Sequence, residues 1–133
     1  MIFPVVIHKD KTSDYGISFP DLVGCFSAGK TYEEALINAQ EAALCHIEGL
    51  LLANEEIPKP SLVDDFIEDQ QYHGGTWALV SVDLAKISGK SKRINVTIPE
   101  NILSRVDLFA KNHGETRSAL LSTAVMEYIL NND

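Results

Sequence analysis

The chain has 133 residues, of which 45% are hydrophobic and 23% are charged, and its formal net charge at pH 7 is −8. This composition is near the average for soluble globular proteins, so it excludes an intrinsically disordered chain. No apolar run reaches the roughly 18 residues that a membrane-spanning helix needs, which excludes a transmembrane protein. We expect a cytoplasmic protein of one ordinary domain or two small ones.

The charge is divided unevenly along the chain. Residues 1–90 hold six Lys/Arg and fourteen Asp/Glu, a net −8, whereas residues 91–133 hold five of each. Such an asymmetry predicts two units with different partners, and the neutral second part is compatible with nucleic-acid binding. We predict a first unit at residues 1–84, a linker at 85–91 with the sequence AKISGKS, and a second unit at 92–133.

The first thirty residues predict antiparallel strands. Ile2 to His8 is rich in β-branched residues, and Pro4 near its start is typical of an edge strand. The same segment lacks the basic region and cleavage site of a signal peptide. KDKTSD predicts a turn, the alternation from Tyr15 to Phe19 predicts the second strand of a hairpin, and Cys25 to Ala28 predicts a short third strand.

The strongest helix signal runs from Thr31 to about Asn54. Thr31 and Glu34 have the spacing of a capping box, in which each side chain accepts a hydrogen bond from the other residue's backbone N–H. An apolar stripe at spacings of three and four faces a sheet; its members are Leu36, Ala39, Ala43, Ile47 and Leu50. Pro58 and Pro60 stop the helix.

The remainder of the first unit predicts a short helix and a last strand. Ser61 to Gln71 indicates a short acidic helix that ends before Gly74 and Gly75. Thr76 to Leu84 predicts a strand with Ala78, Val80, Val82 and Leu84 on one face and with Trp77 and Leu79 making the other partly apolar. The order β-β-(β)-α-β predicts an α+β domain whose main helix packs on one face of a sheet.

The second unit predicts one strand and two helices. In KRINVTI, at 92–98, Ile94, Val96 and Ile98 alternate with polar residues. Pro99 suits the first position of a helix that ends at Gly114, and Thr116 suits the N-cap of a second helix. About 43 residues of this kind cannot close a core alone. Two copies would close it by pairing their strands antiparallel, which predicts a homodimer.

The polar face of that paired ribbon suits the major groove of DNA. It would carry Arg93, Asn95 and Thr97 twice, beside Lys92; Arg suits guanine edges, Asn suits adenine edges, and Thr offers a hydroxyl and a methyl group. The free amides that follow Thr116, at Arg117 and Ser118, suit a phosphate. The alternative is that residues 93, 95 and 97 are only the solvated side of a half-buried strand.

Catalytic and metal sites are not indicated. Carboxylates that could hold Mg²⁺ are available by number alone at Asp10, Asp14, Asp21, Glu41 and Glu48, and the four histidines lack zinc-site spacing. The sequence favours Cys25 and Cys45 as structural thiols in a reducing compartment. We expect no enzyme activity, no cofactor and no metal. The acidic cluster Asp64, Asp65, Glu68 and Asp69 is either a solvated face or a complement to a basic RNA-binding partner.

Two stretches resemble known families. Residues 92–130 resemble a ribbon-helix-helix DNA-binding domain, and residues 1–55, through PVVIHKD and YGISFPDLVGCFSAGKTYEEALINAQEAA, resemble the HicB antitoxin family. The family's usual Pro-Gly before the cysteine is Val23-Gly24 here. The resemblance implies a degraded RNase H-like N-terminal domain that binds and inhibits a small RNA-cleaving toxin, HicA. It also implies that the protein binds operator DNA and represses the promoter of its own operon.

Two functions stay open at this point. The first is a toxin-neutralising repressor with a HicA-like toxin and operator DNA as partners. The second is a ribbon-helix-helix repressor whose N-terminal domain senses a small molecule. The residues that contact the toxin stay unassigned, and a tetramer stays open beside the dimer.

Overall fold

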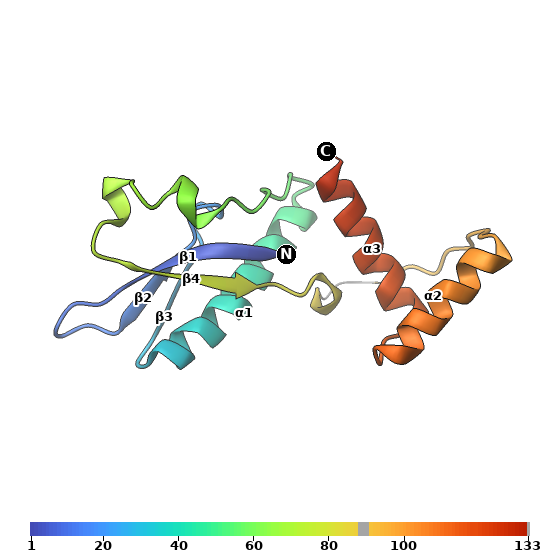
Figure 1. Cartoon of the computed structure of the whole chain (residues 1–133), viewed down its shortest axis with the longest axis horizontal. Helices are drawn as coiled ribbons and strands as arrows, with labels where there is room; N and C mark the ends of the chain where they lie inside the picture. The colour runs from blue at the N-terminus through green and yellow to red at the C-terminus, as the bar shows by residue number, and fades with distance from the viewer. Residues whose placement is uncertain (88–90, 133) are drawn as a thin grey trace. The chain divides into compact units, whose positions relative to one another are not determined.

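The computed structural model describes residues 1–87 and 91–132, and the chain divides into two compact units, Met1–Asp83 and Leu84–Asp133 (Figure 1). The division falls beside the boundary predicted at residue 84. Of the predicted linker, residues 88–90 lie outside the described residues, and its start belongs to a 3₁₀ turn, η3, at Leu84–Lys86.

The first unit is built on a four-stranded antiparallel sheet in the order β3-β2-β1-β4. Its strands are β1 (Ile2–His8), β2 (Tyr15–Ser18), β3 (Phe26–Gly29) and β4 (Thr76–Ser81). All four predicted strands are confirmed, although β4 ends three residues early because η3 begins at Leu84.

The prediction of an edge position for β1 is wrong, since β1 lies between β2 and β4. The reason that Pro4 is tolerated there is local. Strand β2 pairs only with Val6–His8 of β1, whereas Pro4 pairs with Leu79 of β4 on the other side. The missing N–H of Pro4 therefore lies in a stretch of β1 that has a single neighbour.

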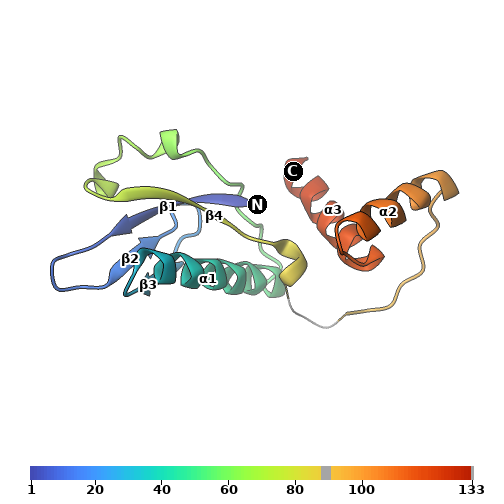
Figure 2. The same cartoon turned by 60° about the horizontal axis from the view of Figure 1, so that its bottom comes forward.

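Helix α1 (Tyr32–Leu52) covers one face of the sheet, as predicted (Figure 2). The Thr31 hydroxyl accepts the Glu34 N–H at 3.1 Å, but the Glu34 carboxylate accepts the N–H of Lys30 at 3.3 Å, one residue before the expected partner. The fully buried stripe is Ala35, Ala39, Ala43 and Ile47, while Leu36 and Leu50 are only half-buried.

Small residues let α1 lie close to β3. A Cβ atom on Gly29 would collide with the backbone of Ala35, so any larger residue would push the helix away. The Asn38 side chain donates to the Ala28 carbonyl at 2.9 Å and ties the helix to the strand. Between the helix and the sheet as a whole lies the core, whose fully or nearly fully buried side chains include Phe3, Val5, Ile7, Ile17 and Phe19.

The opposite face of the sheet, which we call the outer face, is crossed by the segment between α1 and β4 (Figure 2). The predicted acidic helix over residues 61–71 is wrong: the segment contains two 3₁₀ turns, η1 (Val63–Asp65) and η2 (Gln70–Tyr72). Phe66 stacks on Trp77 of β4 with ring centroids 6.3 Å apart, and Tyr72 meets the same ring edge-on at 5.5 Å. Tertiary contacts with Trp77, rather than helical hydrogen bonds, therefore set the path of the segment.

The second unit contains helices α2 (Glu100–Asn112) and α3 (Arg117–Asn131), both as predicted. Pro99 caps α2 instead of occupying its first turn, a difference of one residue. Gly114 has φ +67°, a conformation that favours glycine, and it makes the turn between the two helices. Among the described residues, no helix has both the length and the apolar character to cross a membrane.

Candidate nucleic-acid interface

The predicted ribbon residues lie in an extended segment before α2. Residues 91–99 form no strand in the single chain, because a strand requires a hydrogen-bonded neighbour and one copy supplies none. Lys92, Arg93, Asn95 and Thr97 are all exposed. The four side chains are thus free to contact a ligand, and the prediction of a paired ribbon remains a prediction about two copies.

The apolar side chains that alternate with them are exposed too. Ile94 is 69% exposed and Val96 is 65% exposed, and only Ile98 is partly covered. Removing a side chain of this size from water stabilises a protein by about 1.5–3 kcal/mol. The segment therefore presents an unused apolar face beside its polar one.

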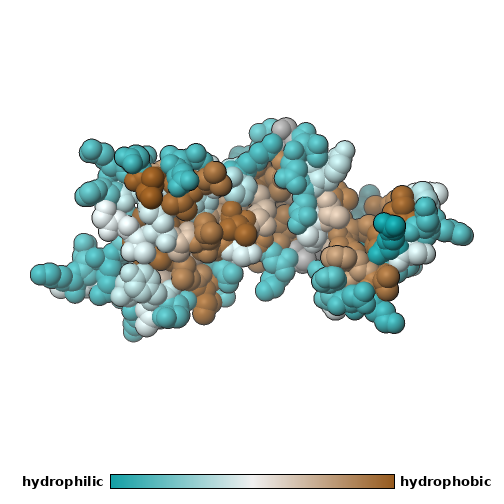
Figure 3. Space-filling model, viewed as in Figure 1, coloured by the Kyte–Doolittle hydropathy of each residue, from teal (hydrophilic) through white to brown (hydrophobic). Residues whose placement is uncertain are grey.

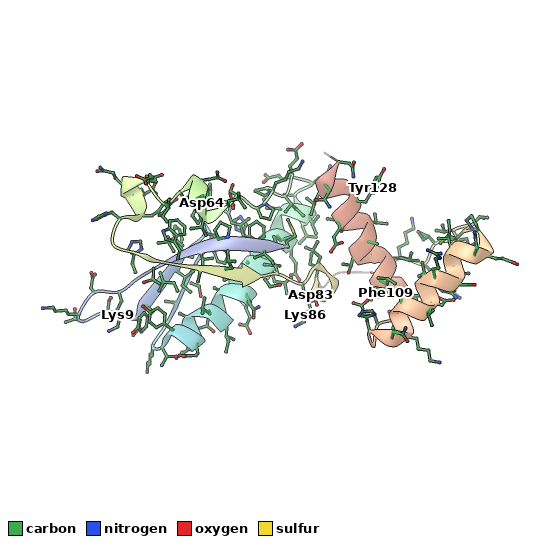
Figure 4. All side chains as sticks on the ribbon, viewed as in Figure 1. Lys9, Asp64, Asp83, Lys86, Phe109 and Tyr128 are labelled. Atoms are coloured by element: carbon green, nitrogen blue, oxygen red, sulfur yellow. The ribbon has the colours of Figure 1, made fainter. Side chains whose placement is uncertain are left out.

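Helices α2 and α3 leave a similar apolar surface uncovered. Figure 4 labels Phe109 on α2 and Tyr128 on α3, and both are exposed. Among the described residues of this unit, the buried apolar side chains are Leu84, Ala110 and Leu130, whereas the large exposed ones also include Ile102, Leu108, Val125 and Ile129. One copy of the unit does not close a core.

The start of α3 has the geometry predicted for an anion site. The Thr116 hydroxyl accepts the Ala119 N–H at 3.1 Å, which confirms the predicted N-cap. The first intrahelical hydrogen bond runs from the Leu120 N–H to the Thr116 carbonyl. The N–H groups of Arg117 and Ser118 precede that bond, so the helix itself supplies no acceptor for them.

The Arg117 side chain has a different role from the one its position suggested. Its guanidinium donates two hydrogen bonds to the Asp107 carboxylate of α2, each 2.8 Å long. These hydrogen bonds lower the pKa of Asp107 and raise the pKa of Arg117. Arg117 thus joins α2 to α3, and its charge is already matched within the unit.

The two units differ sharply in charge. Met1–Asp83 contains four Lys/Arg and fourteen Asp/Glu, a net −10, whereas Leu84–Asp133 contains seven and five, a net +2. The net negative charge of the first unit repels a polyanion such as DNA, whereas the small positive charge of the second unit does not. The electrostatics thus favour the second unit as the nucleic-acid interface.

Among the carboxylates considered for Mg²⁺, that of Asp21 has a structural partner in the first unit. Asp21 accepts hydrogen bonds from the Ser61 N–H at 2.9 Å and from its hydroxyl at 2.6 Å. The backbone of Asp10 closes the β1–β2 turn with Ser13, and Glu41 lies exposed on α1. The described residues contain no group of three or more His, Cys, Asp or Glu side chains placed to hold a metal ion.

The two cysteines are free thiols in the described structure. Cys25 is buried and Cys45 is exposed. Burial, with a smaller contribution from Cys45, raises the pKa of the Cys25 thiol to about 11. A thiol of that pKa is protonated at neutral pH, which fits a core residue and not a nucleophile.

Sequence reasoning missed the aromatic cluster of Phe66, Tyr72 and Trp77 and the double hydrogen bond between Asp21 and Ser61. Neither has a local signature, because the partners are 5 to 11 residues apart in the cluster and 40 apart in the hydrogen bond. The closeness of the three aromatic residues in the sequence was the one available hint. Both features fix the segment that crosses the outer face.

Comparison with known proteins gives a consistent result. Residues 3–125 match the model of a family described as HicB_like antitoxin of bacterial toxin-antitoxin system. The crystal structure of the Burkholderia pseudomallei antitoxin HicB is 40% identical, with a TM-score of 0.75 over 96% of this chain and 98% of that one. A structure described as the HicA3 and HicB3 toxin-antitoxin complex is 35% identical, with a TM-score of 0.55 over 62% of this chain and 99% of that one. An uncharacterised 14.9 kDa protein of Haemophilus phage HP1 is 40% identical over 98% of both chains.

Proposed function

The chain belongs to the family of HicB-like antitoxins of bacterial toxin-antitoxin systems, and from that membership we propose that it neutralises a HicA-like, RNA-cleaving toxin and represses its own operon. The antitoxin role follows from the family. The identity of the toxin, the repression and the assignment of each role to one unit are proposals.

The observation that carries the DNA-binding half is the unclosed second unit. Its apolar face is exposed and segment 91–99 is unpaired, and a second copy could cover the first and pair with the second. A twofold pair buries the same residues on both sides and converts two extended segments into a two-stranded antiparallel ribbon. The ribbon-helix-helix arrangement is thus the simplest arrangement that satisfies both the backbone and the core.

The ribbon would read DNA through its outward side chains. Arg93 and Asn95 have the donor and acceptor patterns for guanine and adenine edges, Thr97 offers a hydroxyl and a methyl group, and Lys92 suits a phosphate. The amides of Arg117 and Ser118, beyond the Thr116 cap, suit another phosphate. The Arg117 side chain is assigned to the Asp107 pair and not to DNA.

Toxin neutralisation is assigned to the acidic first unit. A HicB relative with 35% identity is described in complex with HicA3, and the part of this chain that matches covers 62% of its length. The first unit, which we propose is an RNase H-like fold reduced to a sheet and one helix, needs no chemistry of its own to inhibit a toxin. Covering the RNA-binding or catalytic surface of the toxin is sufficient, so we assign no catalytic residue, metal or cofactor.

The test is co-purification of the full chain with the product of the adjacent reading frame, followed by operator binding. A stable complex that suppresses RNA cleavage, together with sequence-specific binding to the promoter region, is the expected result. If the chain bound its promoter but released it with a small molecule and never bound the neighbouring product, the first unit would be a ligand sensor instead.

A further inference from the structure

The outer face of the first unit carries apolar side chains that nothing in the unit covers. Leu62 is 68% exposed and Ile67 is 56% exposed on the crossing segment, and Leu79 is 63% exposed on β4. Leu79 lies two residues beyond Trp77 and so on the same face of the strand. Figure 3 shows hydrophobic side chains gathered on this side, over the segment and over β1 and β4.

The segment that presents Leu62 and Ile67 is held at several points. Asp21 binds Ser61 at its start, and the Asp65 carboxylate accepts the Leu62 N–H at 2.9 Å. Phe66 and Tyr72 pack on Trp77 in its middle. Because these contacts fix the backbone before any partner arrives, the exposed side chains lose little freedom on binding.

The end of the segment is seated as tightly as its start. A Cβ atom on Gly75 would collide with the side chains of Val6 and His8 on the outer face, so only glycine allows this approach. Burial, with a smaller contribution from the neighbouring Asp69 and Asp21 carboxylates, raises the pKa of Tyr72. The apolar side chains therefore sit on a fixed support and not on a loose loop.

The four acidic residues of the segment fall into two pairs with different surroundings. Asp65 and Asp69 are used internally, since their carboxylates accept backbone N–H groups of Leu62 and Gln71. Asp64 and Glu68 are exposed and make no ion pair or side-chain hydrogen bond within the part of the chain that the structure describes. Figure 4 labels Asp64 on this segment. Two free carboxylates thus stand on the same segment as Leu62 and Ile67, close to them in sequence.

We propose that this surface, the outer-face patch of Leu62, Ile67 and Leu79 with Asp64 and Glu68, is the docking site for the basic RNA-binding surface of the toxin. The proposal rests on the proposed function and names the surface that performs it. A protein that binds RNA must present positive charge to the phosphates, and the two carboxylates offer it a competing anionic surface.

Charge also argues against a second copy of the first unit as the occupant. Each copy of the first unit carries a net −10, so two copies of it facing each other would bring like charges together. A basic toxin reverses the sign of that interaction. Exposed apolar side chains together with free carboxylates are also the two kinds of group that a specific interface combines, in its dry centre and in its polar rim.

The experiment uses the full chain and the purified HicA-like toxin encoded beside it. Asp64→Lys with Glu68→Lys should slow association at least about tenfold at low salt, since opposite charges steer the encounter. Ile67→Ser with Leu79→Ser should raise the Kd about tenfold or more, mainly through faster dissociation. Both sites are exposed, and circular dichroism checks that each variant keeps the fold.

The matched control is Glu33→Lys with Glu41→Lys, which changes net charge equally on exposed positions of α1, the helix on the other face of the sheet. It should leave toxin binding within about threefold, because its effect is limited to screened long-range attraction. Unchanged toxin binding by both patch variants, while the unsubstituted chain binds, would overturn the patch and leave the proposed function standing. A patch variant that altered the oligomeric mass but not toxin affinity would also overturn it. Failure of the unsubstituted chain to bind the toxin would overturn the proposed function itself.

Discussion

The first and second units differ in what one copy of the chain can complete. In the first, α1 and the crossing segment cover both faces of the sheet, and Phe3, Val5 and Val6 are fully buried. In the second, two well-formed helices and an extended segment leave most of their apolar side chains in water. Local signals define helices equally well in both units, but only the first contains every layer that its core requires.

The same contrast separates their partners. The first unit is closed and acidic, so it is suited to a preformed surface that binds a basic protein. The second is nearly neutral and incomplete, so it is suited to assembly with a copy of itself. Association between copies would then create the DNA-binding surface, whereas toxin binding would need only one copy.

The largest effect is expected from Val96→Glu, which attacks the incomplete unit. In a paired ribbon the twofold axis places two glutamates in the interface, and burying them unpaired would cost on the order of 5 kcal/mol or more per dimer. Dimer formation and operator binding should be lost together in sedimentation and anisotropy measurements. Val23→Glu, at a solvent-exposed position of the first unit, is the matched control and should change neither. A Val96→Glu variant that still sedimented as a dimer would contradict the ribbon.

A cavity in the closed unit should have the converse effect. Phe3 is fully buried and meets Phe19 edge-on, with ring centroids 6.5 Å apart. Phe3→Ala should lower the free energy of unfolding of the first unit by about 3–5 kcal/mol through lost burial and cavity formation. Chemical denaturation should show this loss while operator binding persists. Equal destabilisation of both units would mean that they do not fold independently.

Base reading should be the next most sensitive property. Arg93→Ala and Asn95→Ala are each expected to weaken specific operator binding by about 1–3 kcal/mol, with less effect on non-specific DNA. Binding isotherms on operator and scrambled duplexes at moderate salt separate the two. Parent-like operator affinity of the double alanine variant would show that residues 93 and 95 are only the solvated side of the segment.

The smallest expected effect concerns Asp107. Because its carboxylate accepts hydrogen bonds from Nε and from one terminal nitrogen of Arg117, Asp107→Ala should release that guanidinium for phosphate. The plot of log affinity against log salt for non-specific DNA should then become steeper by about one. Glu127→Ala removes the same charge from an exposed position of α3 and should leave the slope unchanged. Equal slopes for the two variants would mean that Arg117 does not reach DNA when it is released.

Most of the first unit could be predicted from sequence because its signals are local. β-branched residues define β1, and Thr31 with Glu34 defines the start of α1. The segment over residues 61–71 was predicted incorrectly because Phe66 and Tyr72 pack on Trp77, a contact that no helix or turn propensity contains. Tertiary contacts overrode the local acidic pattern there.

The second unit shows a different limit. Both helices and the Thr116 cap follow from sequence, yet residues 92–98, predicted as a strand, form none in the single chain, which supplies no hydrogen-bond partner for them. The polar residues predicted to read DNA are exposed on that segment, and their role stays a prediction. The Asp107–Arg117 pair was not foreseen, because ten residues and a turn separate its members.

Separating the two units tests the central claim most directly. Residues 1–84 and residues 85–133 are each co-expressed with the toxin, and growth, RNA cleavage and operator binding are measured for both fragments. Residues 1–84 should protect cells and suppress cleavage without binding the operator, with an association that slows as salt rises. Residues 85–133 should bind the operator as a dimer and give no protection. Protection by the C-terminal fragment alone would show that the two roles have been assigned to the wrong units.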